Sequence, residues 1–132
     1  MAALDTNILL RFLLQDDAPQ SQAATRLIQT ALAAGDTLYV PISVALELEW
    51  VLRSRFKLDK AAVAQTFNGL LQAMELRFEA LTALEWALQQ YEASGADFAD
   101  CLHTGLAGQA GQQPLWTFDA AAAKLDGAKR LA

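Results

Sequence analysis

Two aspartates three residues apart are the clearest chemical signal in this sequence. Asp97 and Asp100 lie in the segment Gly-Ala-Asp-Phe-Ala-Asp-Cys-Leu-His. On a helix this spacing places both carboxylates on one face, and Thr104 joins them one turn later. Two unpaired carboxylates so close repel each other unless a cation neutralises them. The segment therefore predicts a cation site, with Thr104 as a supporting residue behind the ligands.

Two further aspartates each follow an apolar run that is typical of a buried strand. Asp5 comes directly after residues 2–4, and Asp119 comes directly after residues 115–118. In open parallel sheets, ligands bind beyond the carboxyl ends of the strands. We therefore expect both carboxylates at the functional edge of the sheet.

Two glutamates on the predicted helix over residues 44–56 are expected to differ in their surroundings. Glu47 falls at the border of the apolar stripe of this helix, and carboxylates are rarely placed half inside a core without a partner. Glu49 points away from that stripe, so it is predicted to be a solvated surface acid. Glu47 is thus the glutamate of the pair that is expected to have a partner.

Strands and helices alternate along the chain, which predicts an α/β fold with a parallel sheet covered on both faces. Four strands are expected at residues 2–4, 37–40, 76–78 and 115–118, with a fifth at 129–131. Helices are expected at residues 7–14, 18–34, 44–56, 59–74, 83–93 and 98–109, with Ser43, Asp59 and Thr82 as N-caps.

The length of 132 residues suits a single domain over residues 1–132, and 54% hydrophobic residues suit a folded core. No apolar run reaches the roughly 18 residues that a membrane span needs. The first residues lack the basic region of a secretory signal, and Cys101 is the only cysteine, so a reducing, cytoplasmic location is expected. The net charge of −5 disfavours nucleic-acid binding unless bound cations face the phosphates.

Four short motifs, taken in order, resemble those of the PIN-domain family. Asp5-Thr6-Asn7 resembles the opening motif, and the run from Ser43 to Arg53, with Glu47 at the acidic position, resembles the second. Asp100-Cys101-Leu102 resembles a third motif that is usually Asp-Ala-Leu, and Thr117-Phe118-Asp119 resembles the fourth. The resemblance covers the whole chain, and compact PIN domains of this length resemble the VapC-type toxins of bacterial toxin–antitoxin pairs.

The resemblance implies a three-layer α/β/α sandwich with a central parallel sheet of four to five strands. It also implies a Mg²⁺- or Mn²⁺-dependent endoribonuclease that leaves a 5′-phosphate and a 3′-hydroxyl. Asp5, Glu47 and Asp100 would hold the main ion, and Asp119 would hold a second ion or position the attacking water. Asp97 is an additional acid found in part of the family, and would act as a direct or indirect ligand. The implied partners are RNA, a cognate antitoxin protein and a second copy of the chain, with residues 18–34 and 59–74 as candidate dimer helices.

Polar and basic residues near the motifs are candidates for supporting roles. Thr6 is expected to act locally, and Asn7 can form a hydrogen bond across the acid cluster and fix a carboxylate rotamer. Candidates for contact with the RNA backbone are Arg11, which could reach a substrate phosphate, and the basic cluster of Arg53, Arg55 and Lys57, which could alternatively meet an acidic stretch of an antitoxin.

Simpler structural roles compete for several of these residues. Asp5, Asp97 and Asp119 could each cap a helix. Cys101 and His103 point roughly 160° apart on a helix and so cannot pair as a nucleophile and base, which leaves a packing role for Cys101 and a surface role for His103. The three tryptophans sit in apolar patterns and are interpreted as core or dimer contacts rather than as platforms for base stacking: Trp50, Trp86 and Trp116.

Two alternative functions remain beside the nuclease. One is a catalytically silent PIN-like binding module. Such a copy would tolerate the loss of Asp5 or Asp100, so the presence of both acids argues against it. The other is a receiver-like phosphoacceptor domain, which needs paired acids after the first strand and a lysine after a late strand. Here Asp5 stands alone and no strand-end lysine is evident.

Overall fold

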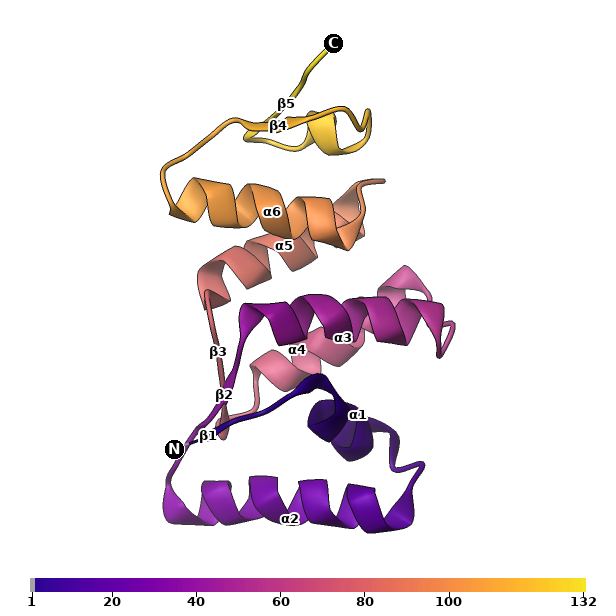
Figure 1. Cartoon of the computed structure of the whole chain (residues 1–132), viewed down its shortest axis with the longest axis vertical. Coiled ribbons are helices and arrows are strands. Elements are labelled where there is room, and N and C mark those ends of the chain that lie inside the picture. Colours follow the sequence, from indigo (N-terminus) through magenta and orange to yellow (C-terminus); the bar gives the residue numbers. More distant parts are fainter. Residues whose placement is uncertain (1) are drawn as a thin grey trace. The chain divides into compact units, whose positions relative to one another are not determined.

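The computed structural model describes residues 2–132 and shows an α/β fold with six α-helices and five short parallel strands (Figure 1). The chain divides into two compact units. We call Met1–Lys57 with Gln65–Glu79 the N-terminal unit, and Leu58–Ala64 with Ala80–Ala132 the C-terminal unit.

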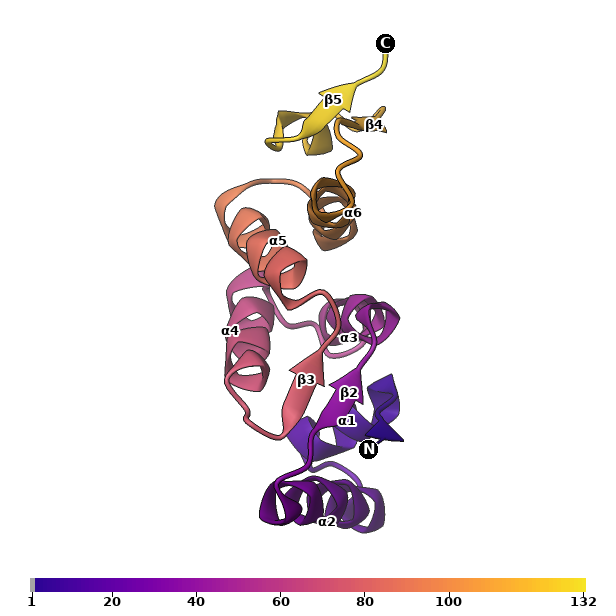
Figure 2. The same ribbon diagram turned by 90° about the vertical axis from the view of Figure 1, so that its left-hand side faces the viewer.

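The N-terminal unit contains a three-stranded parallel sheet in the order β1-β2-β3. Its strands are β1 (Ala2–Ala3), β2 (Leu38–Val40) and β3 (Leu76–Phe78), and β2 and β3 run in the same direction in Figure 2. Alternate residues of β2 and β3 are buried, as a strand with one face on the core requires. The expected strand positions are confirmed here.

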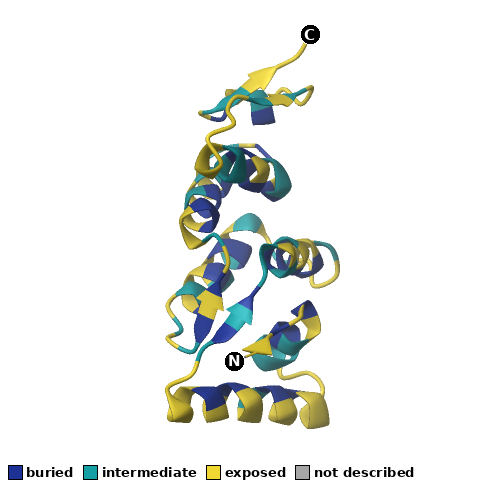
Figure 3. Ribbon diagram, turned by 60° about the vertical axis from the view of Figure 1, so that its left-hand side comes forward, coloured by how far each residue is buried: buried dark blue, intermediate teal, exposed yellow. Residues whose placement is uncertain are grey.

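Helices α1 (Thr6–Leu14), α2 (Ala18–Ala34) and α3 (Ile42–Ser54) belong to the same unit, and α1 packs against both α2 and α3. One side of α2 is buried and the other is exposed (Figure 3). Gly35 ends α2 with a φ of 71°, and its N–H donates to the carbonyls of Ala31 and Leu32. Glycine enters this left-handed conformation without a steric penalty, so α2 stops where β2 must begin.

The C-terminal unit is built from two packed helices followed by two paired strands. Helices α5 (Leu81–Ala93) and α6 (Phe98–Gln109) pack on each other. Strands β4 (Leu115–Thr117) and β5 (Ala128–Arg130) are parallel and are joined through the short 3₁₀ helix η1 (Ala122–Lys124). The five expected strands therefore form two hydrogen-bonded sheets of three and two strands. Helix α4 (Lys60–Leu71) contributes residues to both units.

The expected α/β fold class is confirmed, and two of the three expected N-caps are wrong. Asp59 does cap α4, because its Oδ1 accepts from the N–H of Ala62 at 2.8 Å. Helix α3 already begins at Ile42, so Ser43 lies inside it, and α5 begins at Leu81, so Thr82 lies inside it. None of the helices in the described part of the chain is long and apolar enough to cross a membrane.

Candidate active site

The C-terminal unit brings three aspartates together. Asp97 lies at the N-cap of α6, Asp100 lies in its first turn, and Asp119 follows β4. Each offers one carboxylate oxygen, and these oxygens all lie within 4.8 Å of one another. Two oxygens on opposite sides of a Mg²⁺ ion lie roughly 4.2 Å apart, given Mg–O distances near 2.1 Å. Small side-chain rotations would therefore bring the three oxygens into the range of one hard cation.

Asp97 occupies a capping position without acting as a side-chain cap. Its backbone carbonyl accepts from the N–H of Cys101 at 3.1 Å, but its side chain makes no capping hydrogen bond to α6. An aspartate that served only as an N-cap would accept a hydrogen bond from the N–H of the second or third helical residue. A purely capping role therefore does not explain this carboxylate.

Asp119 does serve as a local cap, which is the structural role that its position after a strand also allowed. Its Oδ1 accepts from the N–H of Ala121 at 2.9 Å and from that of Ala122 at 3.4 Å. Its own N–H donates to the Thr117 hydroxyl at 3.0 Å. A carboxylate can accept about four hydrogen bonds or metal bonds in total, so this capping leaves capacity for a cation. The turn that begins η1 thus fixes where the Asp119 carboxylate points.

The pKa of the Asp100 carboxyl is raised above its ordinary value. Partial burial is the largest cause, followed by the negative charges of Asp119 and Asp97, while the nearby His103 acts in the opposite direction. This is the like-charge repulsion expected from the spacing of the acids. A bound cation would relieve it.

Three residues near these acids on α6 differ in burial and in hydrogen bonding. Thr104 is fully buried, and its hydroxyl donates to the backbone carbonyl of Asp100 at 2.8 Å, rather than to its carboxylate. Cys101 is fully buried, and burial raises the pKa of its thiol. His103 is exposed. The packing role expected for Cys101 and the surface role expected for His103 are confirmed.

The N-terminal unit brings the other two candidate acids to one hollow of about 250 Å³. Asp5 caps α1 through its Oδ1, which accepts from the N–H of Ile8 at 3.1 Å. The buried hydroxyl of Thr6 donates to Oε1 of Glu47 on α3. The hollow is lined by Asp5, Thr6, Asn7, Glu47, Trp50, Val51 and Arg55.

The surroundings predicted for the two glutamates of α3 are wrong. Glu47 is exposed rather than half inside the core. Glu49 was expected in solvent, but it is only 3% exposed, and its Oε2 accepts from Nε of Arg53 at 2.8 Å. The buried residues of α3 include Ala45 as well as Leu48 and Leu52, so the covered face is rotated toward Glu49. Arg53 neutralises the carboxylate, which makes its burial tolerable.

The candidate RNA-contacting cations also differ in their surroundings. Arg11 pairs with Asp16, which raises the pKa of the guanidinium. Arg53 pairs with Glu49, whereas Arg55 lines the hollow that holds Asp5 and Glu47. Lys57 is exposed. Contact of any of these residues with RNA stays a prediction.

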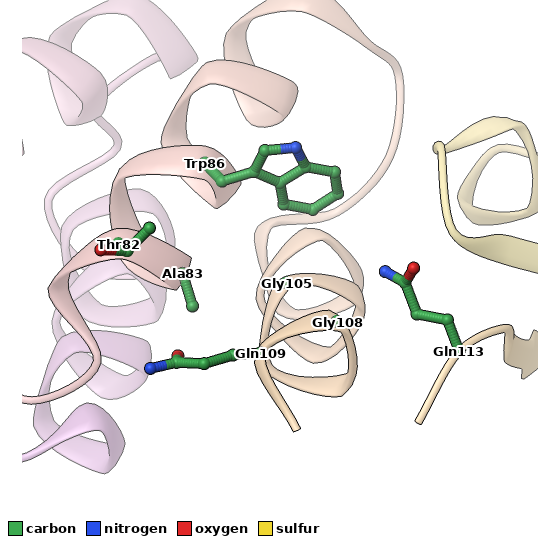
Figure 4. Close-up of a pocket in the computed structure, with 7 residues that line it drawn as sticks. All are labelled: Thr82, Ala83, Trp86, Gly105, Gly108, Gln109 and Gln113. Atoms are coloured by element: carbon green, nitrogen blue, oxygen red, sulfur yellow. The ribbon is translucent and has the colours of Figure 1, made fainter. Parts of the chain in front are cut away.

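The tryptophans were expected to be core or dimer contacts, and for two of them the structure excludes the core, so that a dimer contact stays a prediction. Trp50 and Trp116 are each 54% exposed. Trp86 lines a separate hollow of α5 and α6 in the C-terminal unit, together with Gly105, Gln113 and four neighbours (Figure 4). No candidate acid lines that hollow. Sequence reasoning did not place Trp50 at the hollow that holds Asp5 and Glu47, although it lies three residues after Glu47 and therefore on the same helix face.

The family model described as "PIN domain" matches residues 2–128. No curated protein matches the sequence.

Proposed function

The chain belongs to the PIN-domain family, and we propose that it is a metal-dependent endoribonuclease that hydrolyses RNA phosphodiester bonds. PIN domains are generally nuclease domains, and they typically use divalent metals. The observation that carries the proposal for this chain is the cluster of Asp97, Asp100 and Asp119, whose oxygens lie within 4.8 Å of one another. Asp97 makes no capping hydrogen bond, and the cap that Asp119 forms leaves it further acceptor capacity, so capping alone does not explain the cluster.

The proposed ligands suit Mg²⁺ or Mn²⁺ by chemistry. As the family resemblance implies, Asp5, Glu47 and Asp100 would hold the main ion, and Asp119 would hold a second ion or position the attacking water. Asp97 would act as a direct or indirect ligand. Hard cations of this kind prefer carboxylate oxygens and keep several waters. When bound, such an ion makes a water easier to deprotonate and stabilises negative charge on a phosphate. Thr6 would hold the Glu47 carboxylate in a fixed rotamer through the hydrogen bond that it donates.

The proposal assigns acids from both units to one nuclease domain. The family match runs from residue 2 to residue 128 and so includes residues of both units. Within each unit, the acids already share one cluster or one hollow. On the basis of the family motifs, the four motif acids and Asp97 are proposed as the metal ligands of this nuclease domain.

The biological setting proposed for this activity is that of a toxin in a bacterial toxin–antitoxin pair, located in the cytoplasm and held inactive by a cognate antitoxin protein. A homodimer is also proposed, and Leu27 and Leu32 of α2 support it as exposed apolar side chains. Light scattering at micromolar concentration would give twice the chain mass. A small DNA-binding protein encoded next to this chain would support the toxin assignment.

A catalytically silent PIN-like binding module is the remaining alternative, since family membership displaces the receiver-like interpretation. The retention of all four motif acids favours the enzyme. The test is incubation of the purified protein with total RNA in Mg²⁺, in Mn²⁺ and in EDTA. Cleavage in either metal that EDTA abolishes supports the proposal. Binding of RNA without cleavage in any metal would favour the silent module.

A further inference from the structure

An exposed tryptophan lies beside the candidate ligands of the N-terminal unit. Trp50 is 54% exposed, although free energy favours the burial of so large an apolar surface. It lies on α3, three residues after Glu47, so the two side chains share a face of the helix. Its backbone is held in place, because its carbonyl accepts from the hydroxyl of Ser54 at 2.6 Å. The indole is therefore presented from a rigid element.

Trp50 and Arg55 line the hollow of the N-terminal unit together with Asp5 and Glu47. The Arg55 guanidinium in this hollow is not engaged in an ion pair with another described residue. Within residues 2–132, ion pairs engage Arg11 and Arg53 but not Arg55. An exposed aromatic ring can stack on a base, and a guanidinium can bind a phosphate. A pair of acids can hold a metal ion that binds a second phosphate.

We propose that Trp50 and Arg55 form a binding subsite for one unpaired RNA nucleotide next to the scissile phosphate. The base stacks on the face of the Trp50 indole, and Arg55 binds the phosphate of the same nucleotide or of its neighbour. A base within a duplex is already stacked on both faces, so this subsite selects single-stranded RNA. The subsite rests on the proposed nuclease function, and it adds the two residues that bind the nucleotide beside the cleaved bond.

The second exposed tryptophan provides a matched control. Trp116 on β4 is also 54% exposed. The ammonium of Lys129 lies 5.5 Å from its ring centroid, so one face of that ring is already covered by a cation. Trp116 and Trp50 are therefore the same residue with the same exposure, and only Trp50 lines the hollow that holds candidate ligands.

The experiment measures the binding of a fluorescent single-stranded RNA in Mg²⁺ by proteins that also carry Asp100→Asn to prevent cleavage. We expect Trp50→Leu to weaken binding about tenfold, because base stacking on an aromatic ring is lost while apolar bulk is kept. Trp50→Phe keeps a ring and should restore most of the affinity, and Trp116→Leu should change the affinity less than twofold. Arg55→Gln should lower the slope of log affinity against log salt by about 0.7, the contribution of one phosphate on a single strand, whereas Arg55→Lys should keep it.

A second arm identifies the contact as base stacking. Each position of the RNA is replaced in turn by an abasic nucleotide, and one position is expected at which Trp50 and Trp50→Leu proteins bind equally. A duplex of the same sequence should bind with the same affinity to both proteins. Equal effects of Trp50→Leu and Trp116→Leu on the single strand would overturn the subsite. So would a Trp50→Leu protein that changes from dimer to monomer in light scattering while its affinity for RNA is unchanged.

The failure of this inference and that of the proposed function are distinguishable. If wild-type protein cleaves RNA in Mg²⁺ and Trp50→Leu behaves like Trp116→Leu in cleavage and binding, only the subsite is wrong. If the wild-type protein neither binds nor cleaves RNA in any metal, the nuclease function is wrong and the subsite is overturned with it.

Discussion

At the scale of single residues, two of the candidate ligands combine a structural and a chemical role. Asp5 caps α1, and Asp119 caps the turn before η1, each through its Oδ1. A carboxylate has acceptor sites beyond those used in a cap, so capping and cation binding are compatible. A capped side chain is held in one rotamer, which would orient its remaining lone pairs before an ion binds.

Asp5→Asn and Asp100→Asn should each abolish RNA cleavage while leaving the fold intact. Asparagine caps a helix as well as aspartate does, so α1 should persist in the Asp5 variant. The lost charge would otherwise hold a cation that lowers the barrier by several kcal/mol, so cleavage should fall on the order of a thousandfold or more. Initial rates on a quenched fluorescent RNA in Mg²⁺ measure the loss. Asp59→Asn is the control, because Asp59 caps α4 as Asp5 caps α1 but belongs to neither acid group. Wild-type activity in Asp100→Asn would show that the acids are misassigned.

Glu49→Gln should lower the free energy of unfolding by about 1 kcal/mol while sparing cleavage by the folded protein. The change removes the charge from a buried acceptor that holds the partly exposed Arg53 guanidinium, and charge-assisted hydrogen bonds are stronger than neutral ones. Denaturant melts give the free energy, and rates per folded molecule give the activity. Unchanged stability would mean that the glutamine replaces the acid fully.

The stability of the metal-free protein should depend on pH through Asp100. Its folded-state pKa is raised, so the folded state binds the proton more tightly than the unfolded state does. The tighter proton binding stabilises the folded state at pH values below 3.8, the ordinary pKa of an aspartate. This stabilisation is lost as the pH rises through the higher folded-state pKa of Asp100. Asp100→Asn should therefore melt higher than the wild type at pH 7, and this advantage should disappear as the pH falls toward 4. Thermal melts in EDTA across this range measure it, and an advantage that stays constant with pH would contradict this origin.

At the scale of the elements, the beginnings of helices depend on contacts from other elements as well as on local caps. The N–H of Ile42, the first of α3, donates to Oε1 of Glu79 at 2.8 Å. Glu79 directly follows β3. The N–H of Glu79 in turn donates to the carbonyl of Val40 at 2.9 Å. A residue 37 positions away thus satisfies a helix N-terminus that a serine was expected to cap.

Close packing of α5 on α6 predicts opposite effects of alanine at two helical glycines. A Cβ at Gly105 would lie 3.1 Å from the carbonyl oxygen of Ala83 and 3.1 Å from Cε3 of Trp86, whereas one at Gly69 of α4 meets nothing within 4 Å. Gly69→Ala should raise the free energy of unfolding by roughly 0.5–1 kcal/mol through helix propensity. Gly105→Ala should lower it by about 1 kcal/mol, because overpacking outweighs the same gain. Denaturant melts of both variants test this, and a stabilised Gly105 variant would contradict the tight packing.

At the scale of the whole molecule, the candidate ligands belong to two compact units, and each unit holds its own group of acids. The C-terminal unit alone holds three aspartate oxygens near one another, while the N-terminal unit holds Asp5 and Glu47 at one hollow. A ligand that binds only the folded state stabilises it in proportion to the logarithm of its concentration.

Millimolar Mg²⁺ or Mn²⁺ should therefore raise the melting temperature of the wild-type protein. Both Asp5→Asn and Asp100→Asn should reduce that increase, because each removes a charge that is proposed to bind metal. Differential scanning fluorimetry over a metal titration measures the effect, and Asp59→Asn should keep the full increase. An increase reduced by Asp100→Asn but not by Asp5→Asn would restrict the ion to the C-terminal cluster.

The sequence by itself determined the features that depend on local geometry. Helix periodicity places Asp97 and Asp100 on one face whatever surrounds them, and alternating apolar runs predicted the strands β1 to β5 within a few residues. The short motifs also indicated the family that the match over residues 2–128 now shows.

Only the tertiary structure decided which faces are covered and which distant groups meet. Periodicity shows that residues share a helix face, but packing partners far along the chain determine which face is buried. Glu49 is buried because α3 turns that side inward and Arg53 neutralises it, whereas Glu47 and Trp50 are exposed for the same reason. Asp119 lies near Asp97 and Asp100 because η1 and the β4–β5 pair position its turn, a relation that no local pattern in the sequence encodes.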